Sequence, residues 1–492
     1  MEQRWKCRKT WGSDNVAHSV QTPSQQAVHH GPTLVRGLSL LDSVLLMVGG
    51  IIGSGIFLTA GQIATAVHKP LFFLGVWLIG GLISLLACFA FAEMAAMYPQ
   101  AGGQYIYLRE AYGEFPAFLY GWMVFTVGQS GTIAALAVGF AEYFGALLPF
   151  ASAHQPVVTI LGWTLTRGHL VSTSAIILLT YINIIGLKRG STLVNVATWA
   201  KFAAVGAFVV LGVAIGKGSW SNYTVSLPLD QPASLSHVIS GFGVALIAVF
   251  WAFDGWVYVT WVSGEIKNAQ RVLPRALLLG ILLVGTIYSS VSVVYLYALP
   301  ITQVANETTI AQAAAVALFS SNAAKWLGAT IALSCFGAAS SAILCSARVT
   351  YAMSRDGAFF HAMGRVHPRY RTPALSLIAI GAWSIVLALS GSYDQLYTYV
   401  MFMMVLSYVA GVAALFVLRR KKPDLERPYR CTGYPYLPAL YLLMAGAWAL
   451  NSVATRPKET LIGIGIVFLG APFYAFWRWQ LKRDPQELQE FD

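Results

Sequence analysis

Two short stretches of this chain combine glycines with polar side chains inside otherwise apolar sequence. Between Gly49 and Gly55 four of seven residues are glycine, with Ser54 among them, and farther along Asp254 stands beside Gly255. A glycine costs about 1 kcal/mol relative to alanine inside a helix, so such clusters favour places where a helix stops and restarts. An interrupted helix exposes N–H and carbonyl groups, which are the partners that a small charged solute needs. The same glycines could instead serve only close packing between helices.

The composition places these stretches in a membrane-spanning chain. Only 11% of the 492 residues are charged and 57% are hydrophobic, with a mean hydropathy of +0.63, whereas soluble proteins carry about 25% charged residues. About 20 apolar helical residues span the hydrocarbon core of a bilayer, and five runs are that long: Leu38–Ile63, Leu71–Met97, Val194–Gly216, Val238–Val262 and Ala276–Leu299. They lack the alternation typical of a β-barrel, so we expect an all-α membrane protein.

Apolar runs and the polar breaks between them predict twelve transmembrane helices, which begin near residues 38, 71, 116, 170, 192, 237, 276, 323, 374, 396, 436 and 460. An even number places both termini on one side. A cytoplasmic N-terminus puts most of the 32 Lys and Arg on the cytoplasmic side, as the positive-inside rule requires. The exceptions are Lys201, within a span, and six residues outside or at the outer edge: Lys69, Arg167, Lys217, Lys325, Arg456 and Lys458. The net charge of +12 therefore indicates topology signals that face anionic lipid, not nucleic-acid binding.

We expect one membrane domain, residues 34–480, between a disordered cytoplasmic tail, residues 1–33, and a C-terminal cytoplasmic tail, residues 481–492. The two glycine-marked breaks fall in the first and the sixth span, five helices apart. Two five-helix repeats of inverted topology would give this spacing, with a binding site between the broken helices. Repeat one then covers about residues 34–216 and repeat two about residues 237–418, and two peripheral helices cover about residues 436–479.

Several motifs resemble those of the amino acid–polyamine–organocation (APC) superfamily, and in particular its L-type amino acid transporter (LAT) family with its bacterial relatives. They are Gly53–Phe57, Ala92–Glu93 with Pro99–Tyr105, Ala252–Trp256 with Glu265–Asn268 and Leu273–Ala276, and Ser346–Arg348 with Ser354–Gly357 and His367–Arg369. The resemblance extends from about Leu34 to Arg430. Taken together the motifs are a strong signal, although each one alone is weak.

The resemblance implies a core of ten helices in two inverted repeats, two peripheral helices, and sodium-independent exchange of amino acids. Animal members attach to a glycoprotein heavy chain through an external cysteine. This chain lacks one, because its cysteines fall within spans (Cys88, Cys335, Cys345) or on the cytoplasmic side (Cys7, Cys431). We therefore expect a stand-alone, bacterial-type transporter in the cell membrane, with both termini cytoplasmic and no disulfide-linked heavy chain.

An amino acid inside the bilayer needs both of its charges met, because an unmet charge there costs several kcal/mol. The start of a helix offers N–H groups and partial positive charge, and its end offers carbonyl groups. We therefore expect the substrate carboxylate at Ser54 and Gly55. The substrate ammonium is expected at the carbonyls of Ile51, Trp251 and Asp254, positions that also match the family's binding residues.

Gly53 and Gly255 complete the predicted binding residues, since glycine lets a substrate approach the backbone closely. Trp251 matches an aromatic residue that closes over the bound substrate in the family and is the predicted gate, with a packing or interfacial tryptophan as the alternative. Asp254 has three open roles: a selector for cationic side chains, a proton-linked group, or an acid that caps the broken helix.

Lys201 is the most costly residue of the predicted spans, because a lysine at mid-helix costs about 2.5–3.5 kcal/mol on insertion scales. It lies roughly 13 Å into its helix, too deep for its side chain to reach the surface. It matches the family's fifth-span lysine, whose ammonium takes the place of a sodium ion in sodium-coupled relatives. We expect it to tie the first span to the eighth, through Ser340 or Ser341, or to be proton-linked.

Acidic and basic residues of the loop motifs are expected to form structural or inner-gate ion pairs. Glu93 lies near the cytoplasmic end of the second span and Glu265 follows the sixth, and Arg348 and Arg355 lie on the same side. None of these four is expected to contact the substrate.

Three functions remain open. The first is exchange of L-amino acids by alternating access, and the second is proton-coupled uptake of amino acids or polyamines with Asp254 or Lys201 as the titrating group. The third is a non-transporting amino acid sensor, although sensors usually add a soluble domain. No nucleophile–base pair, metal-ligand spacing or phosphate loop indicates an enzyme, a metal or a cofactor, and no ring of carbonyls or charges indicates a channel.

Overall fold

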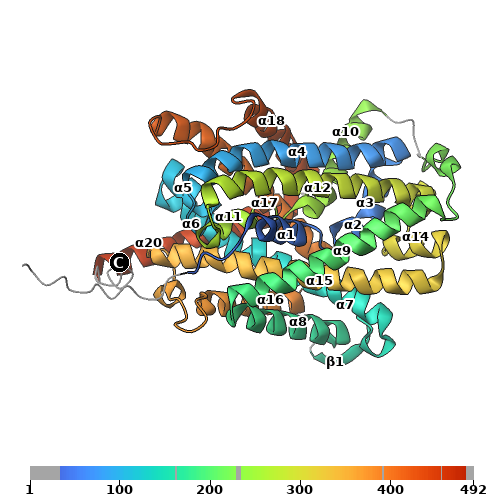
Figure 1. Cartoon of the computed structure of the whole chain (residues 1–492), viewed down its shortest axis with the longest axis horizontal. Coiled ribbons are helices and arrows are strands. Elements are labelled where there is room, and N and C mark those ends of the chain that lie inside the picture. The colour runs from blue at the N-terminus through green and yellow to red at the C-terminus, as the bar shows by residue number, and fades with distance from the viewer. Residues whose placement is uncertain (1–33, 161–162, 229–233, 391–392, 456, 484–492) are drawn as a thin grey trace, which may run out of the picture.

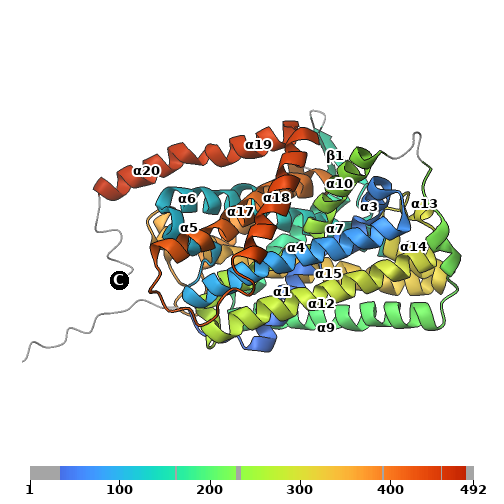
Figure 2. The same cartoon turned by 90° about the horizontal axis from the view of Figure 1, so that it is seen from above.

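The structure is a computed structural model that describes residues 34–160, 163–228, 234–390, 393–455 and 457–483. The predicted N-terminal tail, residues 1–33, lies outside the described residues, as does most of the predicted C-terminal tail. The described chain forms a bundle of long helices that run roughly along one axis (Figures 1 and 2), with one two-stranded hairpin at an end. The predicted all-α architecture is therefore confirmed.

The first half of the chain begins with an interrupted helix and ends with a long one. Its elements are α1 (Leu40–Ile51), α2 (Gly55–Leu58), α3 (Ala60–Val67), α4 (Pro70–Met97), α5 (Gln104–Tyr112), α6 (Glu114–Met123), the π-helical segment η1 (Val124–Gly128), α7 (Gln129–Leu147), η2 (Pro149–Ala151), the antiparallel strands β1 (Pro156–Ile160) and β2 (Trp163–Thr166), α8 (Arg167–Ile184), α9 (Leu187–Ala214) and η3 (Trp220–Thr224).

The second half also begins with an interrupted helix. Its elements are α10 (Leu235–Phe253), α11 (Tyr258–Trp261), η4 (Ser263–Glu265), α12 (Ala269–Ala298), α13 (Ile301–Val304), α14 (Ile310–Leu318), α15 (Ser321–Arg355), η5 (His361–Gly364), α16 (Ala374–Ser390), α17 (Tyr393–Lys421), α18 (Tyr436–Thr455), α19 (Pro457–Phe468) and α20 (Gly470–Arg483).

Each of the twelve predicted spans coincides with a helix or with consecutive helices. Eight helical segments of the described residues are long and apolar enough to cross a membrane: Leu40–Leu58, Pro70–Met97, Glu114–Leu147, Leu187–Ala214, Ala269–Ala298, Ser321–Arg355, Val400–Lys421 and Leu461–Leu481. Shorter apolar helices lie at the predicted sixth and ninth spans. A multi-pass membrane protein follows, while the number twelve and the inverted repeats stay predictions.

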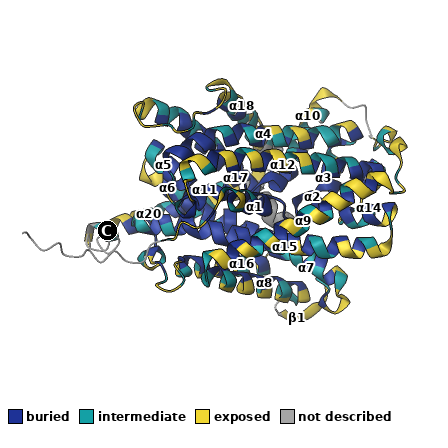
Figure 3. Ribbon diagram, in the orientation of Figure 1, coloured by how far each residue is buried: buried dark blue, intermediate teal, exposed yellow. Residues whose placement is uncertain are grey.

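Burial separates the helices that form the core from those that face lipid. Figure 3 shows α1 dark blue at the centre, whereas α9 and α12 carry yellow, exposed stripes. The exposed residues of the outer helices are large and apolar, among them Leu71 and Leu78 of α4, Val196 and Trp199 of α9, and Leu282 of α12. In a bilayer such faces lie against lipid tails.

Figure 2 shows α19 and α20 along one edge of the bundle, where peripheral helices were predicted.

The first helix begins at a capping box. The N–H of Asp42 donates to Ser39 Oγ (3.2 Å), and the N–H of Ser39 donates to Asp42 Oδ2 (3.0 Å). These two bonds satisfy N–H groups that a helix start leaves without partners. Asp42 also accepts from Asn195 Nδ2 of α9 at 2.9 Å. The start of the first span is thereby fixed to α9.

A short backbone bridge joins the start of the first span to the end of the sixth. The N–H groups of Gly37 and Leu38 donate to the carbonyl of Glu265 (2.9 and 3.0 Å), and the N–H of Lys267 donates to the carbonyl of Leu38 (2.9 Å). The Glu265 carboxylate is fully buried and accepts two hydrogen bonds from the Arg348 guanidinium of α15, at 2.7 and 2.9 Å. The expectation that these loop residues form ion pairs is thus confirmed for Glu265, and its partner is Arg348.

Glu93 pairs with partners that the sequence motifs did not indicate. Its carboxylate accepts from Arg419 Nε (3.0 Å) and Nη2 (2.6 Å) at the end of α17, from Arg427 Nε (3.2 Å) and from the N–H of Cys431 (2.6 Å). Glu93 therefore connects α4 to the end of α17 and to the chain that follows it. Glu93 is completely buried, and its role as a structural or an inner-gate residue stays a prediction.

Sequence reasoning missed the short elements between the spans, namely α5, α13, α14 and the hairpin. Helix α5 is polar enough to resemble a loop, and it is held by Asp356 beyond α15, whose carboxylate accepts from Tyr105 Oη (2.9 Å) and pairs with Arg109. The partners are about 250 residues apart along the chain, so a local pattern does not reveal the contact.

We expect Arg348→Met to destabilise the protein strongly, because it leaves the buried Glu265 carboxylate without its partner. Breaking a buried ion pair in this way costs about 3–5 kcal/mol. The change is measured as the unfolding midpoint in detergent with a thiol-reactive dye, since the described cysteines are all buried and become accessible only on unfolding. The control is Arg478→Met, whose pair with Glu114 is about half exposed and contributes about 0–1 kcal/mol. Equal midpoints for the two variants would contradict this account.

Candidate functional site

The two interrupted helices meet at their breaks. The first break separates α1 from α2 at residues 52–54, and the second separates α10 from α11 at residues 254–257. A methyl group on Gly255 would lie 3.1 Å from the carbonyl carbon of Gly50, and one on Gly55 would lie 2.5 Å from Cα of Ala252. Gly255 also has φ +104°, which favours glycine. The prediction that both helices are interrupted at these glycines, and that the two breaks meet, is confirmed. The glycines also serve close packing between the helices, which was the alternative reading.

A small cavity lies between the two breaks. It is lined by Gly50, Ile51, Gly53, Ser54, Gly55, Thr132, Leu136, Trp251, Asp254 and Tyr258. Its volume is about 10 Å³, which is room for about one water molecule. Six of the seven predicted binding residues line this cavity, and the seventh, Gly255, packs against Gly50 instead. Their contact with a substrate stays a prediction.

Helix α7 contributes a wall of the cavity that sequence reasoning missed. Thr132 and Leu136 come from this helix, and Tyr258 comes from the first turn of α11. A signal was present in the sequence, because Gln129, Ser130 and Thr132 form a polar cluster inside an apolar span. The cluster has Gly128 and Gly131 beside it but no acid, and it has fewer glycines than the first break, so it was not taken to mark a site.

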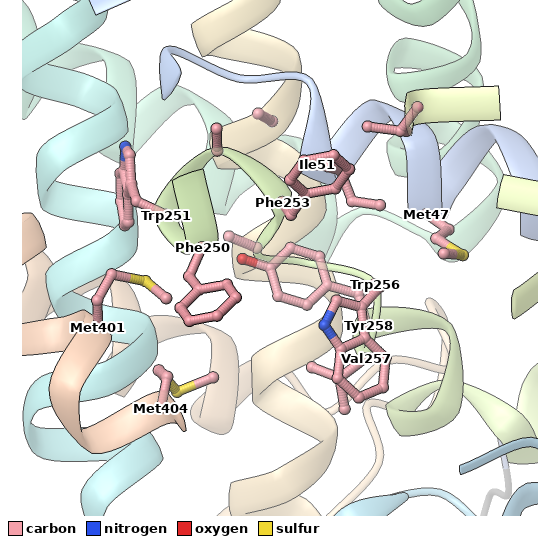
Figure 4. Packing of buried hydrophobic residues seen from close by; sticks show 14 of the residues in the cluster. Met47, Ile51, Phe250, Trp251, Phe253, Trp256, Val257, Tyr258, Met401 and Met404 are labelled. Atoms are coloured by element: carbon pink, nitrogen blue, oxygen red, sulfur yellow. The ribbon is translucent and has the colours of Figure 1, made fainter. Parts of the chain in front are cut away.

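Trp251 and its neighbour Phe250 point in different directions (Figure 4). Trp251 lines the cavity between the breaks. Phe250 faces Met401 of α17, and both line a second small cavity together with Trp256 and Tyr408. Trp251 therefore lines the predicted site, and its gating role stays a prediction.

Lys201 holds the end of α1. Its side chain is buried, and Nζ donates to the carbonyls of Gly49 (2.8 Å) and Ile52. Ser334 Oγ of α15 lies within hydrogen-bond distance of the carbonyls of Ile52 (2.8 Å) and Gly53 (3.1 Å). Carbonyls at the end of a helix have no donor within the helix. Here a lysine from α9 and a serine from α15 provide the hydrogen-bond donors. The first and eighth spans are therefore tied by Ser334, at the same Ile52 carbonyl to which Lys201 donates, whereas the hydrogen bonds of Lys201 itself go to the first span.

The serine that makes this tie is not one of the two expected. Ser340 Oγ accepts from Asn183 Nδ2 of α8 (3.1 Å), and Ser341 Oγ donates to the carbonyl of Gly337 (3.3 Å). The prediction of Ser340 or Ser341 as the partner is therefore wrong. Ser334 lies seven residues before Ser341, on the same face of α15 but two turns away.

Tyr288 of α12 bridges the two breaks. Its hydroxyl lies 3.1 Å from the carbonyl of Ile51 and 2.9 Å from the carbonyl of Ala252. The Ile51 carbonyl also accepts from the N–H of Gly53 (2.8 Å). A substrate ammonium at Ile51 would therefore have to displace a hydrogen bond that exists in this conformation.

One carboxylate oxygen of Asp254 accepts a hydrogen bond, and the other has no partner among the described residues. Tyr408 Oη of α17 donates to Oδ1. Oδ2 is buried and has no hydrogen-bond partner among the described residues. A buried acceptor without a donor costs about 1–3 kcal/mol, and this one belongs to a residue that lines the cavity. A ligand that donates a hydrogen bond would remove that cost.

The chemistry available in the cavity is that of binding and not of bond breaking. Its polar groups are backbone atoms, the hydroxyls of Ser54, Thr132 and Tyr258, and the Asp254 carboxylate. Within the part of the chain that the structure describes, no group of three or more His, Cys, Asp or Glu side chains is placed to hold a metal ion.

Apolar helices that span a membrane and two broken helices that meet around a polar cavity define a membrane transport protein. Comparison with known families agrees: residues 38–473 match the amino acid permease family, and the chain belongs to it. This assignment supports the resemblance of the motifs to the APC superfamily and to LAT-type transporters. Members of this family are transporters and not enzymes.

Three relatives cover nearly the whole chain. The serine/threonine exchanger SteT of Bacillus subtilis (strain 168) is 30% identical over 446 residues, which are 90% of this chain and 96% of SteT. The human b(0,+)-type amino acid transporter 1 is 28% identical, over 90% of this chain and 88% of its own. The human cystine/glutamate transporter is 26% identical, over 94% of this chain and 88% of its own.

We expect Gly55→Ala to reduce transport by roughly tenfold or more, with membrane insertion unchanged. The added methyl group would meet the Ala252 backbone, and overpacking of this kind costs about 1–3 kcal/mol. The measurement is uptake into proteoliposomes of a radiolabelled amino acid that stabilises the purified protein. Gly285→Ala is the matched control, because nothing lies within 4 Å of a methyl group there. Full activity of Gly55→Ala would show that the contact between the breaks does not matter.

Proposed function

We propose that this protein is a sodium-independent exchanger of L-amino acids that works by alternating access. It would act in the cell membrane with both termini cytoplasmic, as the distribution of its basic residues favours. The observation that carries the proposal is the meeting of two interrupted helices around a polar cavity. Relatives named as a serine/threonine exchanger and as amino acid transporters support the substrate class.

The substrate carboxylate would bind at the start of α2, where Ser54 and Gly55 line the cavity. The first N–H groups of a helix have no intrahelical acceptors, and the helix dipole favours a negative charge there. The ammonium would bind on the side of the helix ends, at the carbonyls of Ile51, Trp251 and Asp254. Trp251 would close over the substrate.

Two contacts join separate helices at the predicted cytoplasmic end. The Leu38–Ile266 bridge and the Glu265–Arg348 ion pair join the first span, the sixth span and α15 on that side. Release of a substrate to the cytoplasm would require these contacts to part. We therefore assign them to the inner gate.

Sodium independence is proposed from Lys201. Its ammonium donates to carbonyls at the end of α1, and the matching lysine of the family takes the place of a sodium ion in sodium-coupled relatives. A fixed cation at this position would hold the break without a transported ion. No disulfide-linked heavy chain is proposed, because none of the five cysteines falls in a predicted external loop.

Proton-coupled symport is the second candidate, and Asp254 is the observation that favours it. A buried carboxylate with one unpartnered oxygen can relieve its cost by taking up a proton. The same oxygen could instead accept a hydrogen bond from the substrate. In that case Asp254 would be consistent with an exchanger. Transport measurements separate the two functions.

For an exchanger, we expect labelled amino acid to enter proteoliposomes quickly only when they are preloaded with unlabelled substrate. Replacement of sodium by choline should not change the rate, because Lys201 occupies the place of the ion. Collapse of a pH gradient should not change it either. The control is protein-free liposomes with the same load. Concentrative uptake into empty vesicles driven by an inward proton gradient would instead establish symport.

We also expect Lys201→Met to lower the exchange rate by roughly tenfold or more. The variant keeps much of the side-chain volume but leaves the carbonyls of Gly49 and Ile52 with fewer donors, at about 1–3 kcal/mol for each unsatisfied buried group. Lys217→Met makes the same chemical change at an exposed position after α9 and should retain the rate. Equal rates at matched amounts of reconstituted protein would refute a role for Lys201.

A further inference from the structure

A third cavity opens on the surface where α8 ends and α9 begins. Its volume is about 700 Å³, and it is lined by Ile185, Gly186, Lys188, Arg189, Thr192, Arg369 and Tyr370. Three of these residues are cationic and none is acidic. We call it the α8–α9 basic cavity. It is remote in sequence from the cavity between the breaks, with which it shares no lining residue.

The loop that brings Arg369 to this cavity is held by hydrogen bonds. Thr372 Oγ1 donates to the carbonyl of Ile184 at the end of α8 (2.8 Å), and the N–H of His367 donates to the carbonyl of Thr372 (2.8 Å). The His367 ring nitrogen Nδ1 accepts from the N–H groups of Arg369 and Tyr370, each at 3.2 Å. The backbone that carries Arg369 is therefore fixed beside α8.

The cavity gathers three exposed positive charges and no balancing acid. Lys188 and Arg189 lie in the first turn of α9, where the helix dipole is positive and cations are disfavoured. Arg369 adds a third positive charge from across the cavity. None of the three has an ion-pair partner in the described parts of the chain. An anion in the cavity would offset both the mutual repulsion and the dipole.

The surroundings favour an anion that is attached to a lipid. Next to the cavity, α8 exposes Ile177, Leu178 and Tyr181, and α9 exposes Val196 and Trp199. These apolar side chains form lipid-facing surface on the same two helices. A headgroup phosphate in the cavity would therefore leave its acyl chains against apolar residues. Basic pockets between membrane helices on the cytoplasmic side bind anionic headgroups in this way.

We propose that the α8–α9 basic cavity binds the phosphate group of an anionic membrane lipid. Lys188, Arg189 and Arg369 supply the positive charge, and the first N–H groups of α9 add their partial charge. Occupancy would join the loop before α16 to α9, the helix that carries Lys201. The site does not depend on which amino acid the protein transports.

The test is a titration of the purified full-length protein with phosphatidylglycerol, followed by native mass spectrometry. We expect one tightly bound phosphatidylglycerol and no comparable binding of phosphatidylcholine. The variant Lys188→Gln/Arg189→Gln/Arg369→Gln should weaken binding by roughly 100-fold, at roughly fivefold for each cation. The matched control is Arg271→Gln/Arg275→Gln/Arg420→Gln, which removes the same charge from exposed residues of the same predicted side and should change binding little.

Three results would overturn the proposal. Equal weakening in both triple variants would show diffuse attraction to the basic face instead of a site. Equal binding of phosphatidylcholine would exclude recognition of an anion. Displacement of phosphatidylglycerol from the wild-type protein by millimolar inorganic phosphate would indicate a free-phosphate site, and this competition does not depend on the folding of any variant.

Discussion

The structure depends on how backbone groups freed by two broken helices are satisfied inside a bilayer. Lipid offers no hydrogen bonds, so each freed N–H or carbonyl needs a partner from the protein, a water or a ligand. At the end of α1 the partners are the Lys201 ammonium and the Ser334 hydroxyl, and Tyr288 serves both breaks. These donors come from α9, α15 and α12. The breaks therefore determine which helices must surround them.

Much of this arrangement was predictable because it leaves a local mark. Glycine clusters, a lysine deep within a span and an acid beside a glycine are all costly in a membrane helix, and each marked a position that the structure places at the centre. The loop motifs also indicated that Glu265 would form an ion pair, although they did not single out Arg348 as its partner. The predicted spans all coincide with helices, because a long apolar run is a local signal that does not depend on a distant partner.

The hydrogen-bond partners that lie on different helices were not predictable. They depend on how deep each helix sits in the bundle and how it is rotated about its axis. Ser334 and Ser341 share a face of α15 but differ by two turns, or roughly 11 Å along the axis. The sequence pattern indicates the face, and only the packing of α15 against α1 sets the depth. Tyr408 reaches Asp254 from 154 residues away in the same manner. Neither contact is indicated by the sequence around the residues that make it. The same holds for α5, whose Tyr105 donates to the distant Asp356.

The hydroxyl of Tyr288 connects binding to the conformation of the breaks. It contacts both Ile51 and Ala252 and so links the end of α1 to the end of α10 while the cavity holds no more than about one water. In the proposed exchanger an ammonium at the Ile51 carbonyl would compete with this link. Binding would then loosen one contact between the breaks and supply another through the substrate. In the empty carrier the two breaks would be joined by Tyr288, and in the loaded carrier by the substrate. The two states would therefore reorient at different rates, which is what exchange requires.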